Sequence, residues 1–563
     1  MGTRLGREEP GFVIYSSGNS FRDFSIGGFR GITFDFVGKN ATFNHIKNCF
    51  IGLSPDGKWG YNVKDSQGIR FLYGANHNLI GGLQPEEWNV ISGFNKSALL
   101  IEGNTGYNRI IGNIFGLAAN GMDPIGNGWQ DFSVFSPGKP AVGGIASILL
   151  RAGAHNNTIG GKTSAERNVI CAAGRAGIRI ESVGSDSNIV QGNYIGVAVD
   201  GETAVPNGEA GIQIANGAAY NLIGGNEPGE GNVVSSNWSS GIQLRNNIHH
   251  NKVQGNYIGT NADGTALVPN SHNGIYIFGD SGSGFPEENE IGPGNIIIAD
   301  VMEKPDENTA LTWGAVRFDR SGTTRNIVHG NWIGTNKDGS LGSRWNSGVI
   351  IGGGAHHNRI GPDNIIANNG KWGVWVRQEG TIANTITRNK IYNNDWGAII
   401  LEENGNQSID PPFIVSTAGT RVSGKAQPNG IIEFFKSSNG QADDYLASVS
   451  TDENGDFSWD GGADGEVITA TFTDADGNTS ALSSPRTVPV ELSALNVAVS
   501  GGKVLLEWAT ESETNNLGFF IERKNAISDY KEIGFVRGMG TSTARNSYSF
   551  TDHPGGIGSM TYR

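Results

Sequence analysis

The chain has few cysteines, no excess of positive charge and no long apolar run. Its 563 residues include only Cys49 and Cys171, which lie four repeats apart in the alignment given below, on the order of 19 Å and too far for a disulfide. The formal net charge of −14 disfavours nucleic acid as a partner, because phosphate binding needs a basic surface. No apolar run approaches about 18 residues, so no insertion into a membrane is predicted.

Helical periodicity is missing as well. Apolar residues do not recur every 3.6 positions, and the 86 glycines disfavour long helices. What the chain contains instead is a pair of alternating asparagine motifs. Asn-x-(Ile/Val)-x-Gly-Asn-x-Ile-Gly begins at Asn108 (with Phe115 in place of the last Ile), Asn188, Asn251 and Asn326, and Asn-x-Ile-Gly-(Gly/Pro) begins at Asn78, Asn157, Asn221, Asn289 and Asn358. A period of tens of residues is typical of stacked-repeat architectures.

A third motif marks the start of each repeat. It is a small residue followed by in-out-in apolar alternation, as in Gly177-Ile-Arg-Ile-Glu181. The shortest spacing, from Gly348 to Gly373 to Ala398, is 25 residues, which suits three short strands and tight turns. The motif predicts twelve coils of a parallel β-helix, with starts at Gly31, Gly68, Ala98, Ser147, Gly177, Gly211, Gly241, Gly274, Ala315, Gly348, Gly373 and Ala398.

The repeated asparagines have a structural interpretation. At equivalent turns their side-chain amides are expected to stack into inward ladders, and asparagine also tolerates the left-handed backbone of sharp corners. Asp-Gly pairs such as Asp200-Gly201 are typical of turns. Their carboxylates leave calcium open, but no loop has the dense aspartate spacing of a dedicated calcium site. No metal site and no cofactor are therefore predicted.

The coil motifs end near Asn406, and the pattern then changes. Short alternating strands separated by turns predict two small β-sandwiches, one over 410–487 and one over 488–563 that breaks off within a strand. The expected fold is thus all-β, with a right-handed parallel β-helix over 1–409 followed by two small β-sandwich domains. Residues 1–30 hold no signal peptide, since their first ten residues are polar, so we expect this chain to be a fragment that starts inside or just before the first coil.

Three stretches carry resemblances. The coil motifs resemble the pectate-lyase-like β-helix superfamily, whose members mostly bind or cleave polysaccharides. Asp474-Ala-Asp-Gly-Asn-Thr-Ser480 resembles the β-sandwich that follows β-helix repeats in secreted bacterial proteins. Val488-Pro-Val-Glu-Leu492 and Gly518-Phe-Phe-Ile-Glu-Arg523 resemble the fibronectin-III-like module of Bacteroidetes proteins exported by type IX secretion. These resemblances imply a secreted or cell-surface protein. No catalytic motif of a named lyase or hydrolase family is present, so no active-site role is carried over.

The strand that follows the small residue at the start of each coil is called its first strand. Candidate site residues come from the outward positions of these first strands, two and four residues after each small residue. In the coils nearer the N-terminus, here called the lower coils, these positions hold charges such as Glu102 and Arg151 that suit an exposed ladder of ion pairs. The coils nearer the C-terminus are called the upper coils. In the upper coils the outward positions hold Tyr276, Phe278, Arg317, Asp319, Trp375 and Arg377. Trp238, Trp313, Trp345, Trp372 and Trp396 precede first-strand starts by one to three residues and are expected along one edge of the same face.

Aromatic planes beside carboxylates and arginines suit a polysaccharide groove, because sugar rings pack their C–H faces on aromatic rings. The predicted substrate-binding residues are Tyr276, Phe278, Trp313, Trp345, Trp372 and Trp375. The predicted catalytic residues are Asp319, Arg317, Arg377 and, from the long loop between Asp300 and Trp313, Glu307. A hydrolase would pair Asp319 with a second carboxylate such as Glu307. A lyase would need a base and an arginine that neutralises a uronate.

The sequence leaves both reactions open. It predicts a monomeric, secreted polysaccharide-active protein, with a glycoside hydrolase or a polysaccharide lyase preferred. The alternative is a non-catalytic carbohydrate-binding or adhesin stalk, for which glycine-rich ladders with few buried charges are equally suitable. The structural interpretation of the same features is that the tryptophans cap turns and cover the core, and that the long loops are tolerated surface insertions.

Overall fold

The structure is a computed structural model that describes residues 10–131, 144–300, 313–418, 421–462, 466–487, 492–510, 513–525, 530–542, 545–554 and 559–563. The chain divides into two compact units. The first contains residues up to Ile409 together with Ala475–Ala481, and the second contains Asp410–Asp474 and Leu482–Arg563.

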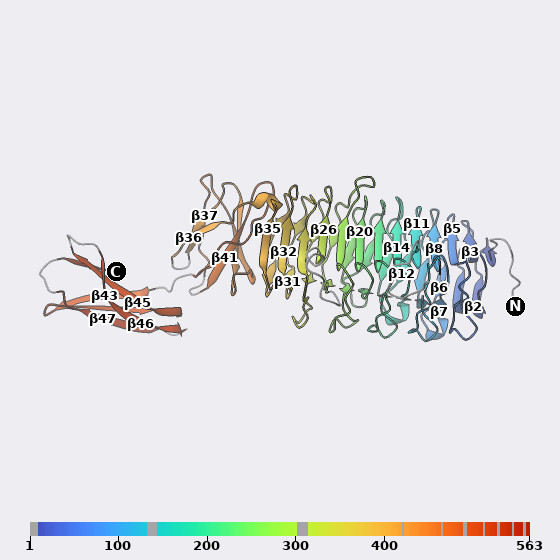
Figure 1. Ribbon diagram of the computed structural model, residues 1–563, viewed down its shortest axis with the longest axis horizontal. Helices are drawn as coiled ribbons and strands as arrows, with labels where there is room; N and C mark the ends of the chain where they lie inside the picture. Colours follow the sequence, from blue (N-terminus) through green and yellow to red (C-terminus); the bar gives the residue numbers. More distant parts are fainter. Residues whose placement is uncertain are drawn as a thin grey trace. The chain divides into compact units, whose positions relative to one another are not determined.

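The first unit is a parallel β-helix, and its first-strand sheet has 13 parallel strands (Figure 1). All twelve predicted first strands are present, and the three-residue strand β1, too short to show alternation in the sequence, precedes them. The strands are β1 (Phe12–Ile14), β3 (Ile32–Val37), β5 (Gln67–Leu72), β8 (Leu99–Glu102), β11 (Ile148–Arg151), β14 (Ile178–Glu181), β17 (Ile212–Ala215), β20 (Ile242–Arg245), β23 (Ile275–Phe278), β26 (Gly314–Asp319), β29 (Ser347–Ile351), β32 (Trp372–Arg377) and β35 (Gly397–Glu402).

A second, 22-stranded parallel sheet supplies the other two strands of each coil. Its two columns join because β2 (Ser20–Ile26) and β4 (His45–Ile51) run through both. One column continues with β6 (Leu79–Gly81), β9 (Arg109–Ile111), β12 (Thr158–Gly160), β15 (Ile189–Gln191), β18 (Leu222–Gly224), β21 (Lys252–Gln254), β24 (Glu290–Ile291), β27 (Ile327–Val328), β30 (Arg359–Ile360) and β33 (Thr385–Ile386). The other continues with β7 (Asn89–Ile91), β10 (Asn113–Phe115), β13 (Val169–Ile170), β16 (Tyr194–Ile195), β19 (Val233–Val234), β22 (Tyr257–Ile258), β25 (Ile296–Ile297), β28 (Trp332–Ile333), β31 (Ile365–Ala367) and β34 (Lys390–Tyr392). The predicted fold class is confirmed.

The asparagines form buried ladders inside the coils, as predicted. Asn221 is 1% exposed; its Nδ2 donates to Oδ1 of Asn251 in the next coil at 3.0 Å, and its own Oδ1 accepts from Asn188 Nδ2 at 3.0 Å. Each amide therefore satisfies its neighbours in a dry interior, where an unpaired polar group is costly. The ladder comprises Asn19, Asn44, Asn78, Asn108, Asn157, Asn188, Asn221, Asn251, Asn289, Asn326, Asn358, Asn384 and Asn406.

One detail of the asparagine prediction was wrong. The left-handed corner position is taken by the residue before the ladder asparagine, such as Tyr220 (φ 56°) before Asn221 or His250 (φ 56°) before Asn251. The ladder asparagine needs its side chain inside the coil, so the turn itself is made one residue earlier. We call the two residues before each ladder asparagine, the second of which makes this left-handed turn, the corner pair.

The Asp-Gly turns lie at the tips of hairpins that leave the coil between the third strand and the next first strand. Val197 and Ala204 form an antiparallel bridge across one such hairpin. Each hairpin touches the next one along the stack. Val199 N donates to Gly121 O at 3.3 Å, and Ala262 N donates to Gly201 O at 3.0 Å. Beneath them, outside the coil, lies a second apolar core that includes Leu53, Leu117, Val197 and Val268.

The last coil is closed by Ala475–Ala481, a segment separated from Ile409 by the 65 residues 410–474. Asn478 Oδ1 accepts from Ala383 N at 2.6 Å, and Asn406 Nδ2 donates to Thr479 O at 3.0 Å. Thr479 Oγ1 accepts from Ile386 N at 2.9 Å, and Asn478 and Thr479 are fully buried. The segment thus supplies the acceptors that a further coil would have provided, and we call it the end cap.

The second unit contains small antiparallel sheets, as predicted. Two of them are β36 (Phe413–Ala418), β37 (Arg421–Lys425) and β40 (Asp456–Trp459), and β39 (Asp444–Ser450), β38 (Ile431–Lys436), β41 (Val467–Thr473) and β42 (Arg486–Thr487). The others are β43 (Leu492–Ser500), β44 (Lys503–Thr510) and β47 (Asn546–Asp552), and β46 (Lys531–Ser542), β45 (Glu513–Asn525) and β48 (Met560–Tyr562). The domain limits at 487 and 488 stay predictions.

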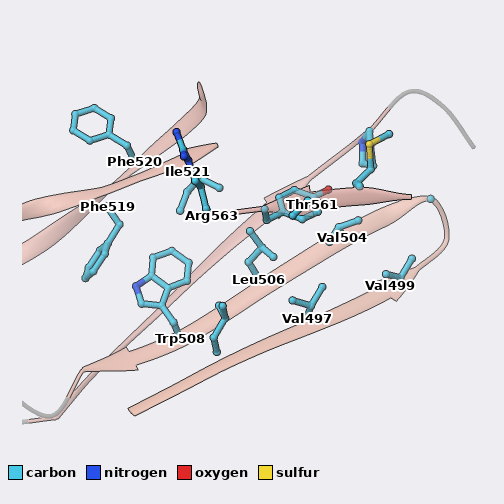
Figure 2. Close-up of a pocket in the computed structure, with 15 residues that line it drawn as sticks. Val497, Val499, Val504, Leu506, Trp508, Phe519, Phe520, Ile521, Thr561 and Arg563 are labelled. Atoms are coloured by element: carbon cyan, nitrogen blue, oxygen red, sulfur yellow. The ribbon is translucent and has the colours of Figure 1, made fainter. Parts of the chain in front are cut away.

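An apolar cavity of about 680 Å³ lies among the last two of these sheets. Trp508 and Leu506 of β44 and Phe519 and Ile521 of β45 line it (Figure 2). Its lining is mostly hydrophobic, and the lining residues Val497, Val499 and Phe520 are more than half exposed, so the cavity is open to solvent.

Candidate functional site

The register of the first-strand sheet brings four of the predicted residues together. Tyr276 pairs with Arg317 and Phe278 pairs with Asp319 on the adjacent strands β23 and β26. Residues two apart on a strand point to the same side, and the two rings of β23 stack with centroids 4.1 Å apart and planes 17° apart. We call Tyr276, Phe278, Arg317 and Asp319 the central cluster.

Asp319 is the hub of the central cluster. Its Oδ2 accepts a hydrogen bond from the Tyr276 hydroxyl at 3.1 Å and another from Arg317 Nη2 at 2.6 Å. Its Oδ1 accepts from the backbone N–H of Arg320 at 3.0 Å. Charge-assisted hydrogen bonds of this kind hold a carboxylate in one orientation.

Burial raises the pKa of the Tyr276 phenol to about 12, and the negative charge of Asp319 adds to the shift. The phenol therefore keeps its proton at neutral pH and can donate it in a hydrogen bond. Two guanidinium groups lie near the rings: Arg317 lies 5.2 Å from the Tyr276 ring centroid and Arg245 lies 5.1 Å from that of Phe278. The cluster combines aromatic surface, a proton donor, a carboxylate and two cations.

Trp375 and Arg377 form a separate group. Ile350 of β29 stands in register between Arg317 and Trp375, and Gly352 follows two residues later. The predicted exposure of Trp375 was wrong, since only 5% of it is accessible. The Arg377 guanidinium lies 4.5 Å from the centroid of the Trp375 ring, and Trp375 Nε1 donates a hydrogen bond to Glu402 Oε2 at 3.0 Å. The single polar atom of the indole is thus bound by a carboxylate on the next strand, which holds the ring against the sheet.

The edge beside this face carries the remaining aromatics. Trp313 packs on His272 with ring centroids 4.5 Å apart, and Trp372 meets Trp396 edge-on at 6.1 Å. Trp345 is half-buried at the same edge. The predicted edge of tryptophans therefore contains a histidine as well.

His272 is a residue that the sequence analysis missed. Burial lowers the pKa of its imidazole, and the positive charge of Arg317 lowers it further. Ser239 Oγ lies 3.3 Å from its Nδ1. The signal was present in the spacing, because His272 precedes Gly274 by two residues just as Trp313 precedes Ala315. Arg245, also missed, occupies an outward position one coil below Phe278.

A second carboxylate for Asp319 is not among the contacts that the structure gives it. Glu307 and the rest of 301–312 lie outside the described residues. The nearest coil below offers Asp280, which pairs with Arg245 at 3.4 Å. Among the described residues no group of three or more His, Cys, Asp or Glu side chains is arranged to hold a metal ion.

The lower coils of the same face differ. Arg70 binds Asp35 at 2.7 Å and lies 3.8 Å from Glu102, which Arg151 also binds at 2.8 Å. The predicted ladder of ion pairs is present there, and it carries no aromatic ring at the outward positions of these four strands. No helix in the described part of the chain is long and apolar enough to cross a membrane.

Comparisons with known proteins add little. No protein family matches the chain, and neither does any protein of curated function. Among solved structures, the chain is similar to the A-module of a mannuronan C-5 epimerase from Azotobacter vinelandii. The match covers 70% of this chain and 86% of that one, with 14% identity and a TM-score of 0.20. At these values it assigns no substrate and no residue role.

Proposed function

We propose that this protein binds and modifies an acidic polysaccharide at the central cluster on the outer face of β23 and β26. The observation that carries the proposal is the convergence of the Tyr276 hydroxyl and the Arg317 guanidinium on one carboxylate oxygen of Asp319, beside two stacked rings. Structural ion pairs on this face, such as Arg70 with Asp35, lack the phenol and the rings.

The substrate class follows from the charges and rings. Tyr276 and Phe278 offer apolar surface for the C–H faces of sugars. Arg317 and Arg245 lie near these rings, where a carboxylate on the sugar would meet a cation. A uronic-acid polymer satisfies both features. Arg377 beside Trp375, two strands further on, would meet a later uronate of the same chain, and Trp313, Trp345 and Trp372 would border it.

A lyase reaction suits the cluster better than hydrolysis. Arg317 would pair with the uronate carboxylate, Asp319 would accept the proton from the neighbouring carbon, and Tyr276 would donate to the departing glycosidic oxygen. The high pKa of Tyr276 keeps it in the donating form. A hydrolase would need a second carboxyl group about 5 to 9.5 Å from Asp319, the part for which Glu307 was predicted.

A non-catalytic binding protein or adhesin is the second candidate. One observation favours it: Arg317 and Asp319 satisfy one another at 2.6 Å, as the structural pairs of the lower coils do. In that case the same rings and cations would hold the polymer without changing it.

The deciding experiment incubates the protein with a panel of uronate-containing and neutral polysaccharides and measures unsaturated products, reducing ends and binding. Asp319→Asn and Tyr276→Phe should lower product formation by about 100-fold or more while polymer binding stays within a few-fold. Arg151→Gln, on the lower coils, is the matched control and should change neither. Binding without any product would leave the adhesin, and reducing ends without unsaturation would replace the lyase by a hydrolase.

We also propose that the protein works outside the cell as a monomer, with the second unit serving export or display. This rests on the resemblance of the tail to modules of type IX secretion cargo. Calcium, left open by the sequence, is testable in the same assay by adding a chelator.

A further inference from the structure

The corner pairs carry six of the ten histidines of the chain. Four coils have a histidine there, and the geometry repeats: Nδ1 of one ring faces a polar atom of the neighbouring corner residue. In two coils that atom is an amide oxygen, with His77 Nδ1 2.6 Å from Asn76 Oδ1 and His155 Nδ1 3.0 Å from Asn156 Oδ1. In the other two it is a second imidazole nitrogen.

These double-histidine corners are His249–His250 and His356–His357. Their Nδ1 atoms lie 3.0 Å and 2.8 Å apart. An amide oxygen requires a proton on the facing Nδ1, whereas two imidazoles can both turn unprotonated lone pairs to the same point. Metal–nitrogen bonds of about 2.0 Å at a right angle place their two nitrogens about 2.8 Å apart. The separation therefore suits neighbouring ligands of a square or octahedral metal ion.

At the first double corner a carboxylate sets the tautomer. His250 Nε2 lies 3.2 Å from Glu288 Oε2, and Arg325 Nε donates to the other oxygen of Glu288 at 3.0 Å. A carboxylate on Nε2 holds the ring proton there, which leaves the lone pair on Nδ1 for a metal, and carboxylates beside histidine ligands commonly do this in metal sites. At the second double corner, Nδ1 of His356 instead lies 3.3 Å from the Thr324 hydroxyl.

We propose that His249 and His250 form a chelating site for copper(II) or nickel(II), and that His356 and His357 form a weaker copy. Two imidazoles supply two ligands, and since no group of three or more potential ligands occurs in the described ranges, water or a bound molecule completes the coordination. Imidazole ligands in a right-angled arrangement favour copper and nickel over tetrahedral zinc. The site is independent of the polysaccharide cluster, because it lies at the turn before the second strands.

The test is a titration of the full chain with copper(II), followed by calorimetry and by electron paramagnetic resonance, in which nitrogen ligands split the copper signal. Two sites per chain are expected, the tighter one at His249–His250. His250→Asn should remove the tight site, and His357→Asn the weak one. The first variant reproduces the His155–Asn156 corner that the chain already folds with, and asparagine accepts the left-handed backbone there.

Two further variants sharpen the result. Glu288→Gln should weaken the tight site by about 10- to 100-fold and leave the weak one unchanged. Asn156→His should create a third double corner and a third site, while His155→Asn and His77→Asn should have no effect. The proposal is overturned if the copper stoichiometry survives His250→Asn and His357→Asn, or if Asn156→His adds no copper.

Discussion

The inside and the outside of the same coils obey different rules. Inside, one contact recurs along the whole stack: the Nδ2···Oδ1 distance is 2.9 Å between Asn78 and Asn108 and 3.0 Å between Asn221 and Asn251. Outside, the first-strand face changes from Asp35–Arg70 ion pairs to the rings and arginines around Asp319. The stack needs identical interior groups at each level, whereas outward positions meet only solvent and their neighbours. The repeat therefore fixes the scaffold and leaves the outer face to acquire function.

The largest effect is expected inside. Asn221→Leu should lower the free energy of unfolding by about 3–5 kcal/mol, because it removes the amide and leaves acceptors and donors of two neighbouring coils unpaired in a dry core. Chemical denaturation of the full chain measures the loss. Tyr220→Asn, at the exposed left-handed position next to it, should stay within about 0.5 kcal/mol. A loss below 1 kcal/mol for Asn221→Leu would show that the ladder is not what stabilises the stack.

A smaller, local effect is expected where the ladder ends. Asn478→Ala removes the acceptor for Ala383 N and should destabilise the last coil by about 1–3 kcal/mol. Hydrogen exchange should accelerate in β33 and β35 but not in β14, and Asn439→Ala in an exposed turn of the second unit should change neither. Uniform acceleration along the stack would mean that the end cap stabilises the first unit globally.

On the outer face the effect depends on pH. The folded state favours the protonated form of Tyr276, whose pKa is raised from near 10 to about 12. Its contribution to stability is present below pH 10 and is lost as the pH rises through 12. The stability difference between the parent and Tyr276→Phe should therefore shrink by about 1–2 kcal/mol over this range. Tyrosinate absorbance measures the same phenol directly, and titration near pH 10 would contradict the buried hydrogen bond.

The smallest effect is expected in the lower coils. Arg151→Gln breaks the pair with Glu102, in which the arginine side chain is 43% exposed. We expect a loss of at most about 0.5 kcal/mol that shrinks further in high salt, as for other exposed pairs. A larger loss that persists at high salt would show that the outer face contributes to the scaffold as the interior does.

The same contrast explains what the sequence could predict. Asn221 and the start at Gly211 were predictable because their environment repeats at every level. The burial of Trp375 was not, because it depends on Glu402, which belongs to the next coil alone. His272 shares the offset of Trp313 but not its chemistry, so a search for tryptophans passed over it. Asn478 carries no coil motif around it, and only the folded chain shows that it accepts a hydrogen bond from the last coil.

The end cap has a consequence for the order of events as the chain is made. Residues up to Ile409 emerge first, yet Ala383 N–H donates to Asn478 and the Asn406 amide donates one of its two hydrogen bonds to Thr479, both in the later end cap. A chain synthesised or exported from its amino terminus must therefore keep the last coil open until residues 410–481 have followed. During that interval the coil presents an unpaired parallel edge to other chains. The first unit can therefore be completed only after residues 410–474 of the second unit have been made or exported.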